Sequence, residues 1–227
     1  MTARTGHLPA DGVRTMFDRI APVYDAMNHA MTAGLDRRWR RLAAHAVVAE
    51  GDRVLDACCG TGDLALAASS AGGVVTGLDF SEAMLERARR KSSEIEWVDG
   101  ALLHLPFGDC SFDTATVGFG VRNVEDLDLA LRELRRVVKT GGRLAILERV
   151  RPKGPIALFY KAWFDGLIPL AGKVIPGGAA YGYLPASVRR FPGPAELADR
   201  VRAARFHPVA HRLLGGGIVV LLVGEAQ

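Results

Sequence analysis

The sequence predicts an α/β fold built on a mostly parallel sheet, and three observations support this prediction. Short hydrophobic runs alternate with amphipathic stretches over residues 53–148, which is typical of a parallel sheet with right-handed crossovers. A tight glycine turn joins the first hydrophobic run to its helix. Two further hydrophobic runs flank Gly215-Gly216-Gly217 near the end of the chain, which indicates a closing strand pair with one antiparallel strand.

The individual strands and helices are predicted from the same hydrophobic pattern. Seven strands are expected at 53–57, 74–79, 94–98, 111–117, 144–148, 207–211 and 218–223. Helices are expected at 64–70, 82–91, 127–138 and 194–204. Ser81 is a suitable N-cap for the second helix, and Gly141-Gly142 is interpreted as the stop signal of the third.

Two regions lie outside this alternation, within one domain expected to span residues 1–227. Residues 13–49 predict an N-terminal helical arm, broken near Pro22, while residues 1–11 are expected to be disordered. An apolar, aromatic-rich insertion at about 152–190 follows the fifth strand and is expected to roof a ligand crevice as a lid. The alternative is that this insertion is an ordinary packed helix pair.

Composition narrows the class of protein. The chain of 227 residues is 49% hydrophobic, enough for one α/β domain with a sizeable core. Its three cysteines form no disulfide framework and no metal-binding pattern, so a reducing cytoplasm is expected and no metal. The net charge of +4 comes without an aromatic platform, so no nucleic-acid partner is expected. The sequence has neither a secretory signal nor an apolar stretch that would span a membrane.

The most informative segment runs from Val54 to Asp63. A hydrophobic strand ends at Asp56, and the turn Gly60-Thr61-Gly62 follows, whose glycines let backbone approach a ligand closely. Asp79 ends the next strand, where an acid can hold the hydroxyls of a ribose. Asp79 could also cap the following helix, and the two roles are compatible.

The glycine turn favours a nucleoside cofactor with an amino-acid tail over a dinucleotide. A dinucleotide site requires a third glycine, which is absent here, and Asp63 places negative charge where a pyrophosphate would lie. A cofactor with an amino-acid tail tolerates that acid, because its ammonium group can pair with it. S-adenosylmethionine is such a cofactor, whereas a nicotinamide-dependent oxidoreductase is disfavoured.

Several motifs together resemble one family. The chain is similar over nearly its whole length to the ubiquinone/menaquinone biosynthesis C-methyltransferases, which are class I S-adenosylmethionine-dependent enzymes with a Rossmann-like fold. The motifs that carry this resemblance are residues 17–28, Trp39-Arg40-Arg41, the turn from Asp56 to Asp63, Gly118-Phe119-Gly120-Val121-Arg122-Asn123, and Tyr183-Leu184-Pro185-Ala186-Ser187.

The resemblance implies C-methylation of a polyprenyl quinol, with demethylmenaquinol as the favoured acceptor. A benzoquinol precursor of ubiquinone and another phenolic or small-molecule acceptor remain alternatives, and a non-catalytic RNA- or membrane-binding module is a more distant one. The apolar tail implies a cytoplasmic protein that visits the inner face of the membrane. Residues 155–184, with Lys153, Lys161 and Lys173, are the expected contact. The oligomeric state stays open.

The resemblance also assigns cofactor-binding residues. The turn at Gly60, Thr61 and Gly62 with Asp56 approaches the cofactor, Asp79 holds its ribose, Gly100-Ala101-Leu102 borders the adenine, and Gly118 opens a loop near the reaction centre. Two positions depart from the family pattern. Many relatives carry Asp or Asn at Ala101 and Ser at Gly118, so the adenine partner here must be Asp99, backbone or water.

Three residues are predicted to carry the chemistry. Arg122 is expected to stabilise the phenolate that develops on the acceptor, Asn123 to orient it, and Tyr24 of the arm to cover the methionine tail. In the alternative interpretation, Asn123 caps the next helix, Arg122 pairs with Glu125 or Asp126, and Tyr24 anchors the arm.

Overall fold

The computed structural model describes residues 9–152, 154, 157 and 178–227. The first eight residues and most of the predicted insertion at 152–190 therefore lie outside the described residues, as do Lys153, Lys161 and Lys173. No helix within the described ranges is both long enough and apolar enough to cross a membrane.

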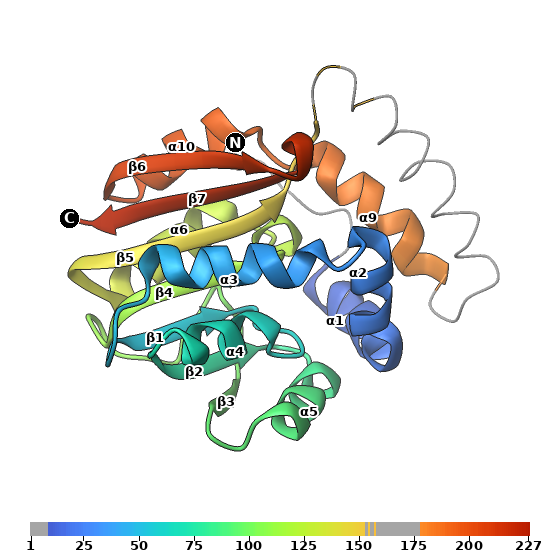
Figure 1. Ribbon diagram of the computed structural model, residues 1–227, viewed down its shortest axis with the longest axis horizontal. Coiled ribbons are helices and arrows are strands. Elements are labelled where there is room, and N and C mark those ends of the chain that lie inside the picture. The colour runs from blue at the N-terminus through green and yellow to red at the C-terminus, as the bar shows by residue number, and fades with distance from the viewer. Residues whose placement is uncertain (1–8, 153, 155–156, 158–177) are drawn as a thin grey trace.

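A single seven-stranded sheet forms the centre of the molecule (Figure 1), with the strand order β3-β2-β1-β4-β5-β7-β6. All neighbouring strands are parallel except β7, which runs antiparallel to both β5 and β6. This arrangement confirms the predicted sheet. The strands are β1 (Arg53–Ala57), β2 (Val74–Asp79), β3 (Glu96–Asp99), β4 (Phe112–Gly118), β5 (Val138–Arg149), β6 (Phe206–Leu214) and β7 (Val219–Ala226).

Helices cover both faces of the sheet. On the face toward the viewer in Figure 1 lie α3 (Leu35–Val47) and α4 (Asp63–Ser70), and behind the sheet lie α6 (Leu127–Val137) and α10 (Pro194–Ala203). The inner stripe of α6 is fully buried, and it joins β1, β4 and β5 in the largest hydrophobic cluster. Helix α5 (Glu82–Lys91) connects β2 to β3 and is capped by Ser81, as predicted. The Oγ of Ser81 accepts a hydrogen bond from the backbone N–H of Met84.

The N-terminal arm folds at one end of the sheet. Helices α1 (Ala10–Ile20) and α2 (Tyr24–Thr32) are joined by the short 3-10 helix η1 (Ala21–Val23), so the predicted break at Pro22 is confirmed. Helix α1 begins at Ala10, so the expected disorder is wrong at its last two residues. Beside α1 lies α9 (Gly178–Arg190), the described end of the insertion (Figure 1).

One boundary prediction was wrong for a clear reason. Helix α6 ends at Val137, and β5 begins at Val138, so Gly141-Gly142 lies inside a strand and is not a helix stop. A Cβ on Gly142 would approach the carbonyl oxygen of Asp113 to 2.5 Å. The glycine is therefore required by close strand contact, at a point where the pairing of β4 with β5 shifts register.

Candidate active site

A well-formed cleft lies where the parallel strands end. We call it the main cleft; its volume is about 770 Å³, and it is lined by the loops after β1, β2, β3 and β4 together with α1 and Tyr24. Of the predicted cofactor residues it contains Gly60, Asp79, Gly100, Ala101, Leu102 and Gly118. The rule that ligands bind beyond the carboxyl ends of parallel strands thus placed these residues correctly.

The two glycines of the turn have different roles. Gly60 has a φ of +55°, and no atom lies within 4 Å of the position that a Cβ would occupy, so its backbone faces open space in the cleft. Gly62 also has a left-handed φ of +86°, but a Cβ there would approach the Trp97 ring to 2.5 Å. Gly60 is therefore the glycine that admits a ligand, and Gly62 is required by packing.

Asp79 is held firmly beneath the turn. Its Oδ2 accepts a hydrogen bond of 2.8 Å from the backbone N–H of Gly60, and its Oδ1 accepts one of 2.9 Å from that of Ser81. Burial raises the pKa of Asp79 to about 6, although these backbone donors oppose the shift. Asp79 thus fixes the turn relative to β2 and still borders the main cleft, while Ser81, not Asp79, is the helix cap.

A smaller recess opens beside the main cleft. This turn pocket is lined by residues that include Arg40, Asp56, Thr61, Asp63 and Tyr24. The register of β1 against β4 places Asp56 opposite Thr116, whose hydroxyl donates a 2.8 Å hydrogen bond to Oδ1. Oδ2 of Asp56 is buried and has no hydrogen-bond partner among the described residues. Burial raises the pKa of Asp56 to about 7.

The turn pocket matches the tail of an amino acid. The carboxylate of Asp56 is suited to an ammonium group. Arg40 also lines the pocket, but its guanidinium is already paired with Asp36 at 2.5 Å. The ammonium group of an amino-acid tail would therefore satisfy the unpaired oxygen of Asp56. The cofactor inferred from the sequence therefore fits the residues present, with its nucleoside in the main cleft and its amino-acid tail in the turn pocket.

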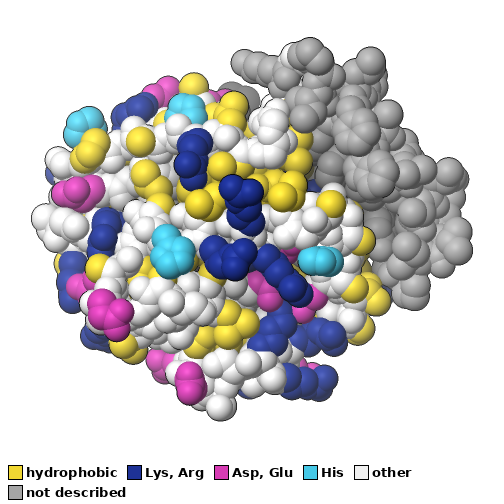
Figure 2. All heavy atoms as spheres, viewed as in Figure 1, with side chains coloured by type: hydrophobic (Ala, Val, Ile, Leu, Met, Phe, Trp, Pro, Cys, Tyr) yellow, Lys and Arg dark blue, Asp and Glu magenta, His cyan; other side chains and the backbone are white. Residues whose placement is uncertain are grey.

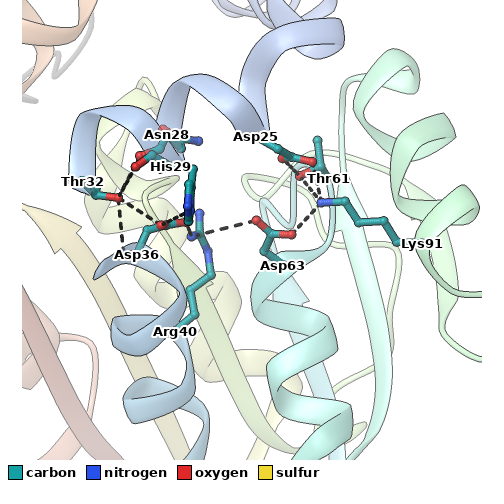
Figure 3. Close-up of polar contacts among 9 residues, drawn as sticks. All are labelled: Asp25, Asn28, His29, Thr32, Asp36, Arg40, Thr61, Asp63 and Lys91. Atoms are coloured by element: carbon teal, nitrogen blue, oxygen red, sulfur yellow. Dashed lines mark hydrogen bonds and ion pairs between the residues drawn. The ribbon is translucent and has the colours of Figure 1, made fainter. Parts of the chain in front are cut away.

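The sequence suggested that Asp63 pairs with the ammonium group of the cofactor, but Asp63 is already paired within the protein. Figure 3 shows that Asp63 lies between two cations of the protein itself: its Oδ1 is 2.6 Å from Lys91 Nζ, and its Oδ2 is 4.0 Å from Arg40. Lys91 also contacts Asp25 Oδ2 at 2.7 Å and Thr61 Oγ1 at 3.0 Å. We call Asp25, Thr61, Asp63 and Lys91 the arm clamp, because they join α2 to the glycine turn.

The adenine end of the main cleft follows the sequence prediction less closely. Ala101 and Leu102 line the cleft as expected. Asp99, one of the proposed adenine partners, is not among the residues that line it, and its Oδ1 instead lies 3.7 Å from Arg14 of α1. Backbone or water therefore remain as the adenine partners.

The loop after β4 is strained and tightly built. Phe119 has a φ of +61°, unusual for a residue with a side chain, and lies between the guanidinium groups of Arg40 and Arg149. A Cβ on Gly120 would approach that of Cys58 to 2.4 Å. This close approach brings η2 (Val121–Asn123) to the mouth of the main cleft.

Arg122 forms a buried ion pair. Its guanidinium lies 2.5 Å from Glu148 Oε1, and the side chains of Arg122 and Glu148 are 7% and 0% exposed. Burial opposes its charge, but Glu148 outweighs this and raises the pKa of Arg122, so Arg122 is a permanent cation. The alternative pairing with Glu125 or Asp126 was therefore wrong, and Asp126, not Asn123, caps α6. Sequence reasoning did not identify Glu148.

A third cavity joins the main cleft from the arm side. This arm pocket has a volume of about 500 Å³, and its lining includes Met16, Met27 and Met31 of α1 and α2. It shares Phe17, Tyr24, Phe119 and Asn123 with the main cleft. Tyr24 alone among the described residues lines the main cleft, the turn pocket and the arm pocket, so it lies at their junction.

Three polar groups that line the arm pocket lack hydrogen-bond partners among the described residues. Arg122 Nε, Asn123 Oδ1 and the Tyr183 hydroxyl are buried there without hydrogen-bond partners in the part of the chain that the structure describes. We call these three residues the polar corner. Buried polar groups that the protein itself does not satisfy mark a place for polar groups of a ligand. Sequence reasoning assigned no role to Tyr183, although it belongs to a motif noted for the resemblance.

The fold and the site together define an S-adenosylmethionine-dependent methyltransferase of class I. The main cleft beyond the strand ends adjoins the turn pocket, and the arm pocket meets both at Tyr24. No group of three or more potential metal ligands occurs within the described ranges.

Comparison with known sequences gives the particular family. The profile of the ubiE/COQ5 methyltransferase family matches residues 5–225, and the chain belongs to this family. The 2-phytyl-1,4-naphtoquinone methyltransferase of Synechococcus elongatus is 42% identical over 96% of this chain and 99% of that protein. The demethylmenaquinone methyltransferase of Thermus thermophilus is 42% identical over 92% of this chain and 99% of its own length.

Solved structures share the fold at much lower identity. A possible histamine N-methyltransferase of Thermotoga maritima superposes with a TM-score of 0.67 at 22% identity, covering 94% of this chain and 99% of its own. The [4+2]-cyclase SpnF superposes with a TM-score of 0.72 at 18% identity, covering 100% of this chain and 99% of its own. Since one of these two is named as a cyclase, the fold alone does not define the reaction.

Proposed function

We propose that the protein transfers a methyl group from S-adenosylmethionine to a ring carbon of a demethylated polyprenyl quinol, with demethylmenaquinol as the acceptor. One observation carries this proposal. The arm pocket is lined by apolar side chains and by the three residues of the polar corner, and it shares Tyr24, Phe119 and Asn123 with the main cleft. A hydroquinone with a hydrocarbon tail has this same division of polar and apolar surface.

The walls of the arm pocket suit an apolar ring and the start of a tail. Met16, Met27 and Met31 offer unbranched, polarisable side chains that adapt to irregular hydrocarbon, and Phe17 and Ile20 complete the wall. The sequence had assigned this task to the insertion at 152–190. In the described residues the arm performs it, with α9 contributing Tyr183.

The residues of the site supply positioning and charge stabilisation. The cofactor provides an electrophilic methyl group on a sulfonium sulfur. Arg122 stays cationic and cannot act as a base at neutral pH, so its role is to stabilise negative charge as the acceptor hydroxyl loses its proton to water. The ring carbon bonds to the methyl group as S-adenosylhomocysteine departs, then loses its own hydrogen as a proton to water, and the phenolate oxygen regains a proton. Asn123 Oδ1 orients the acceptor, and Tyr24, at the junction, holds the methionine tail and the ring in register.

The names of the relatives favour a naphthoquinol ring. A naphthoquinone and a demethylated menaquinone appear in the names of the two relatives that are 42% identical. A relative from Syntrophotalea carbinolica, 40% identical over 95% of this chain and 94% of its own length, is named for both ubiquinone and menaquinone biosynthesis. A benzoquinol acceptor therefore remains the second candidate.

The tail of such an acceptor implies contact with a membrane surface. The apolar segment 155–184 with its lysines supports a peripheral visit from the cytoplasmic side. Sedimentation with vesicles of an anionic phospholipid should recover the protein, and the recovered fraction should fall when apolar residues of this segment are replaced by serine. Recovery that does not change would contradict the assignment to this segment.

The acceptor is tested by competition. The purified protein receives S-adenosylmethionine with equal amounts of reduced short-tail demethylmenaquinol and its benzoquinol counterpart, and products are identified by mass spectrometry. We expect a gain of one methyl group on the naphthoquinol. A gain on the benzoquinol alone would correct the ring, and no gain on either, with cofactor binding demonstrated, would overturn the proposed acceptor class.

Arg122 is tested in the same assay. Arg122→Ala should lower turnover by about 100-fold or more, as expected when a donor to developing negative charge is removed. Affinity for S-adenosylhomocysteine, measured by calorimetry, should stay nearly unchanged, since Arg122 does not line the main cleft or the turn pocket. Normal turnover in this variant would contradict the role. Arg132→Ala, on the exposed face of α6, is the matched control.

A further inference from the structure

We infer that Tyr183, from the described end of the insertion, is a second hydrogen-bond donor to the acceptor's hydroxyl oxygen, acting beside Arg122. This inference deepens the proposed function and rests on it. Tyr183 touches the acceptor in this assignment, so it belongs to the specificity of the site and not only to the packing of α9.

The position of Tyr183 is the first argument. Helix α9 packs against both α1 and η2, so it reaches the arm and the loop that carries Arg122 and Asn123. From this helix Tyr183 lines the arm pocket, in which Arg122 and Asn123 also lie. Two elements far apart in the sequence thus bring their polar groups to the same pocket.

The state of the hydroxyl is the second argument. The Tyr183 oxygen is buried, and no described residue hydrogen-bonds to it. Burial raises the pKa of Tyr183, although Arg122 and Arg190 oppose this shift. The phenol therefore remains protonated at neutral pH and presents a donor. A buried hydroxyl without a partner destabilises a protein, so it is more readily understood as serving a ligand.

The combination of groups specifies the ligand chemistry. Arg122 Nε–H and the Tyr183 hydroxyl are two donors, which suit one oxygen that gains negative charge. Asn123 Oδ1 is an acceptor, which suits a hydroxyl that keeps its proton. A hydroquinone carries both kinds of oxygen once one of its hydroxyls has begun to ionise. The polar corner therefore recognises a hydroquinone rather than an aliphatic or fully alkylated ring.

The test compares two probes of similar size, one with two hydroxyl groups on a naphthalene ring and one with methyl groups in their place. Binding of 1,4-dihydroxynaphthalene, kept reduced under argon with dithionite, and of 1,4-dimethylnaphthalene is measured for wild type and Tyr183→Phe in the presence of S-adenosylhomocysteine. Wild type should prefer the diol by about ten- to a hundredfold, the value of one or two hydrogen bonds to a charged group. Tyr183→Phe should lose most of this preference, with affinity for S-adenosylhomocysteine unchanged.

A second readout separates recognition from packing. Because the hydroxyl has no partner in the described structure, the melting temperature of Tyr183→Phe should equal or exceed that of wild type. Ser70→Ala, which removes a hydroxyl on α4 that lines neither the main cleft nor the arm pocket, is the control and should keep the preference for the diol. A lower melting temperature in Tyr183→Phe would overturn the inference in favour of a structural role.

Other outcomes distinguish this inference from the proposed function. If Tyr183→Phe keeps the full preference for the diol while wild type methylates a quinol, the role of Tyr183 is overturned and the proposed function stands. If wild type shows no preference for the diol, Tyr183 recognises no hydroxyl. Methyl transfer to either quinol in the competition assay then decides separately whether the proposed function survives.

Discussion

Two ion clusters flank the reaction site, and they differ in burial. The pair of Arg122 and Glu148 is almost fully enclosed, with side chains 7% and 0% exposed. In the arm clamp, the side chains of Lys91, Asp25 and Asp63 are 26%, 34% and 29% exposed. Arg122 of the first cluster lines the arm pocket, whereas the second cluster joins the arm to the glycine turn.

The difference in burial determines whether each cluster can open. A fully buried pair cannot open without leaving a charge in an apolar interior, so it fixes Arg122 permanently at the arm pocket. Glu148 also accepts hydrogen bonds from the backbone N–H groups of Arg122 and Arg149, which anchors the loop itself. A half-exposed cluster exchanges its contacts with water at small cost, which suits an arm that must admit a cofactor.

Breaking the buried pair should have the largest effect. Glu148→Gln leaves the guanidinium of Arg122 enclosed without its counter-charge, so the free energy of unfolding should fall by about 3 to 5 kcal/mol. Urea denaturation measures this loss. Glu86→Gln is the matched control, because Glu86 pairs with Arg90 at 3.8 Å on the exposed face of α5 and should change stability by less than about 1 kcal/mol.

A double variant sharpens this result. Arg122→Met with Glu148→Gln removes the enclosed charge and should recover part of the lost stability without restoring turnover. If the single variant Glu148→Gln loses less than about 1 kcal/mol, the pair behaves like the arm clamp and the contrast between the two clusters fails.

Asp56 is a buried carboxylate that forms no ion pair within the described residues, so replacing it should change stability by an intermediate amount and in the opposite direction. Its pKa rises from 3.8 to about 7 on folding, so the native state binds more protons than the unfolded state between these values. Stability should therefore fall as pH rises from about 4 to about 7, and Asp79, with a pKa of about 6, contributes to the same trend.

Asp56→Asn removes the cost of ionising this group. At about pH 8 the variant should be more stable than wild type by on the order of 2 kcal/mol, and at about pH 4 the two should be nearly equal. Affinity for S-adenosylhomocysteine should nonetheless fall, because the ammonium group loses its partner. Denaturation at both pH values checks the first point. A variant less stable than wild type at about pH 8 would show that Asp56 is stabilised in a way its contacts do not reveal.

Opening the arm clamp should have the smallest effect on global stability. Lys91→Met leaves Asp25 and Asp63 without their shared cation, and the loss should be no more than about 1 kcal/mol because these groups are partly solvated. The local effect should be larger. Affinity for S-adenosylhomocysteine should weaken, and trypsin should cleave faster after Arg14 and Arg19 in α1, since the arm is held less firmly.

The same helix provides the control for this variant. Arg90→Met removes a cation whose side chain is 74% exposed, so neither cleavage in the arm nor cofactor affinity should change. Added salt should bring wild type toward Lys91→Met in both measurements, because salt screens solvated pairs. Equal behaviour of the two variants would show that the clamp does not hold the arm.

The basic surface illustrates how local sequence and tertiary structure share control. The sequence places four arginines around Trp39, and the helical period divides them: Arg40 and Trp39 are buried, while Arg37, Arg38 and Arg41 are exposed. Figure 2 shows Lys and Arg side chains gathered on the face that carries α3. Packing of α3 against α4 and β5 decides which arginine enters the site.

Prediction from the sequence succeeded for features that depend on residues close together in the chain. The order of strands and helices, the turn at Gly60 and the acid at the end of β2 are local signals, and the rule on strand ends brings them together. Prediction failed where partners are distant. Glu148 lies 26 positions after Arg122, and Lys91 lies 28 positions after Asp63, so no spacing rule connects them.

The sequence by itself determined the α/β alternation, the cofactor turn and the family, because periodicity and motifs are written in consecutive residues. Only the tertiary structure decided which acid stays unpaired: Asp63 is neutralised by Lys91, whereas Asp56 faces the turn pocket. It also decided that three methionines of the arm line the arm pocket in the described residues. The physical reason is that burial and ion pairing depend on which elements the sheet brings together. A sequence pattern does not contain the distances between side chains that are far apart in the chain.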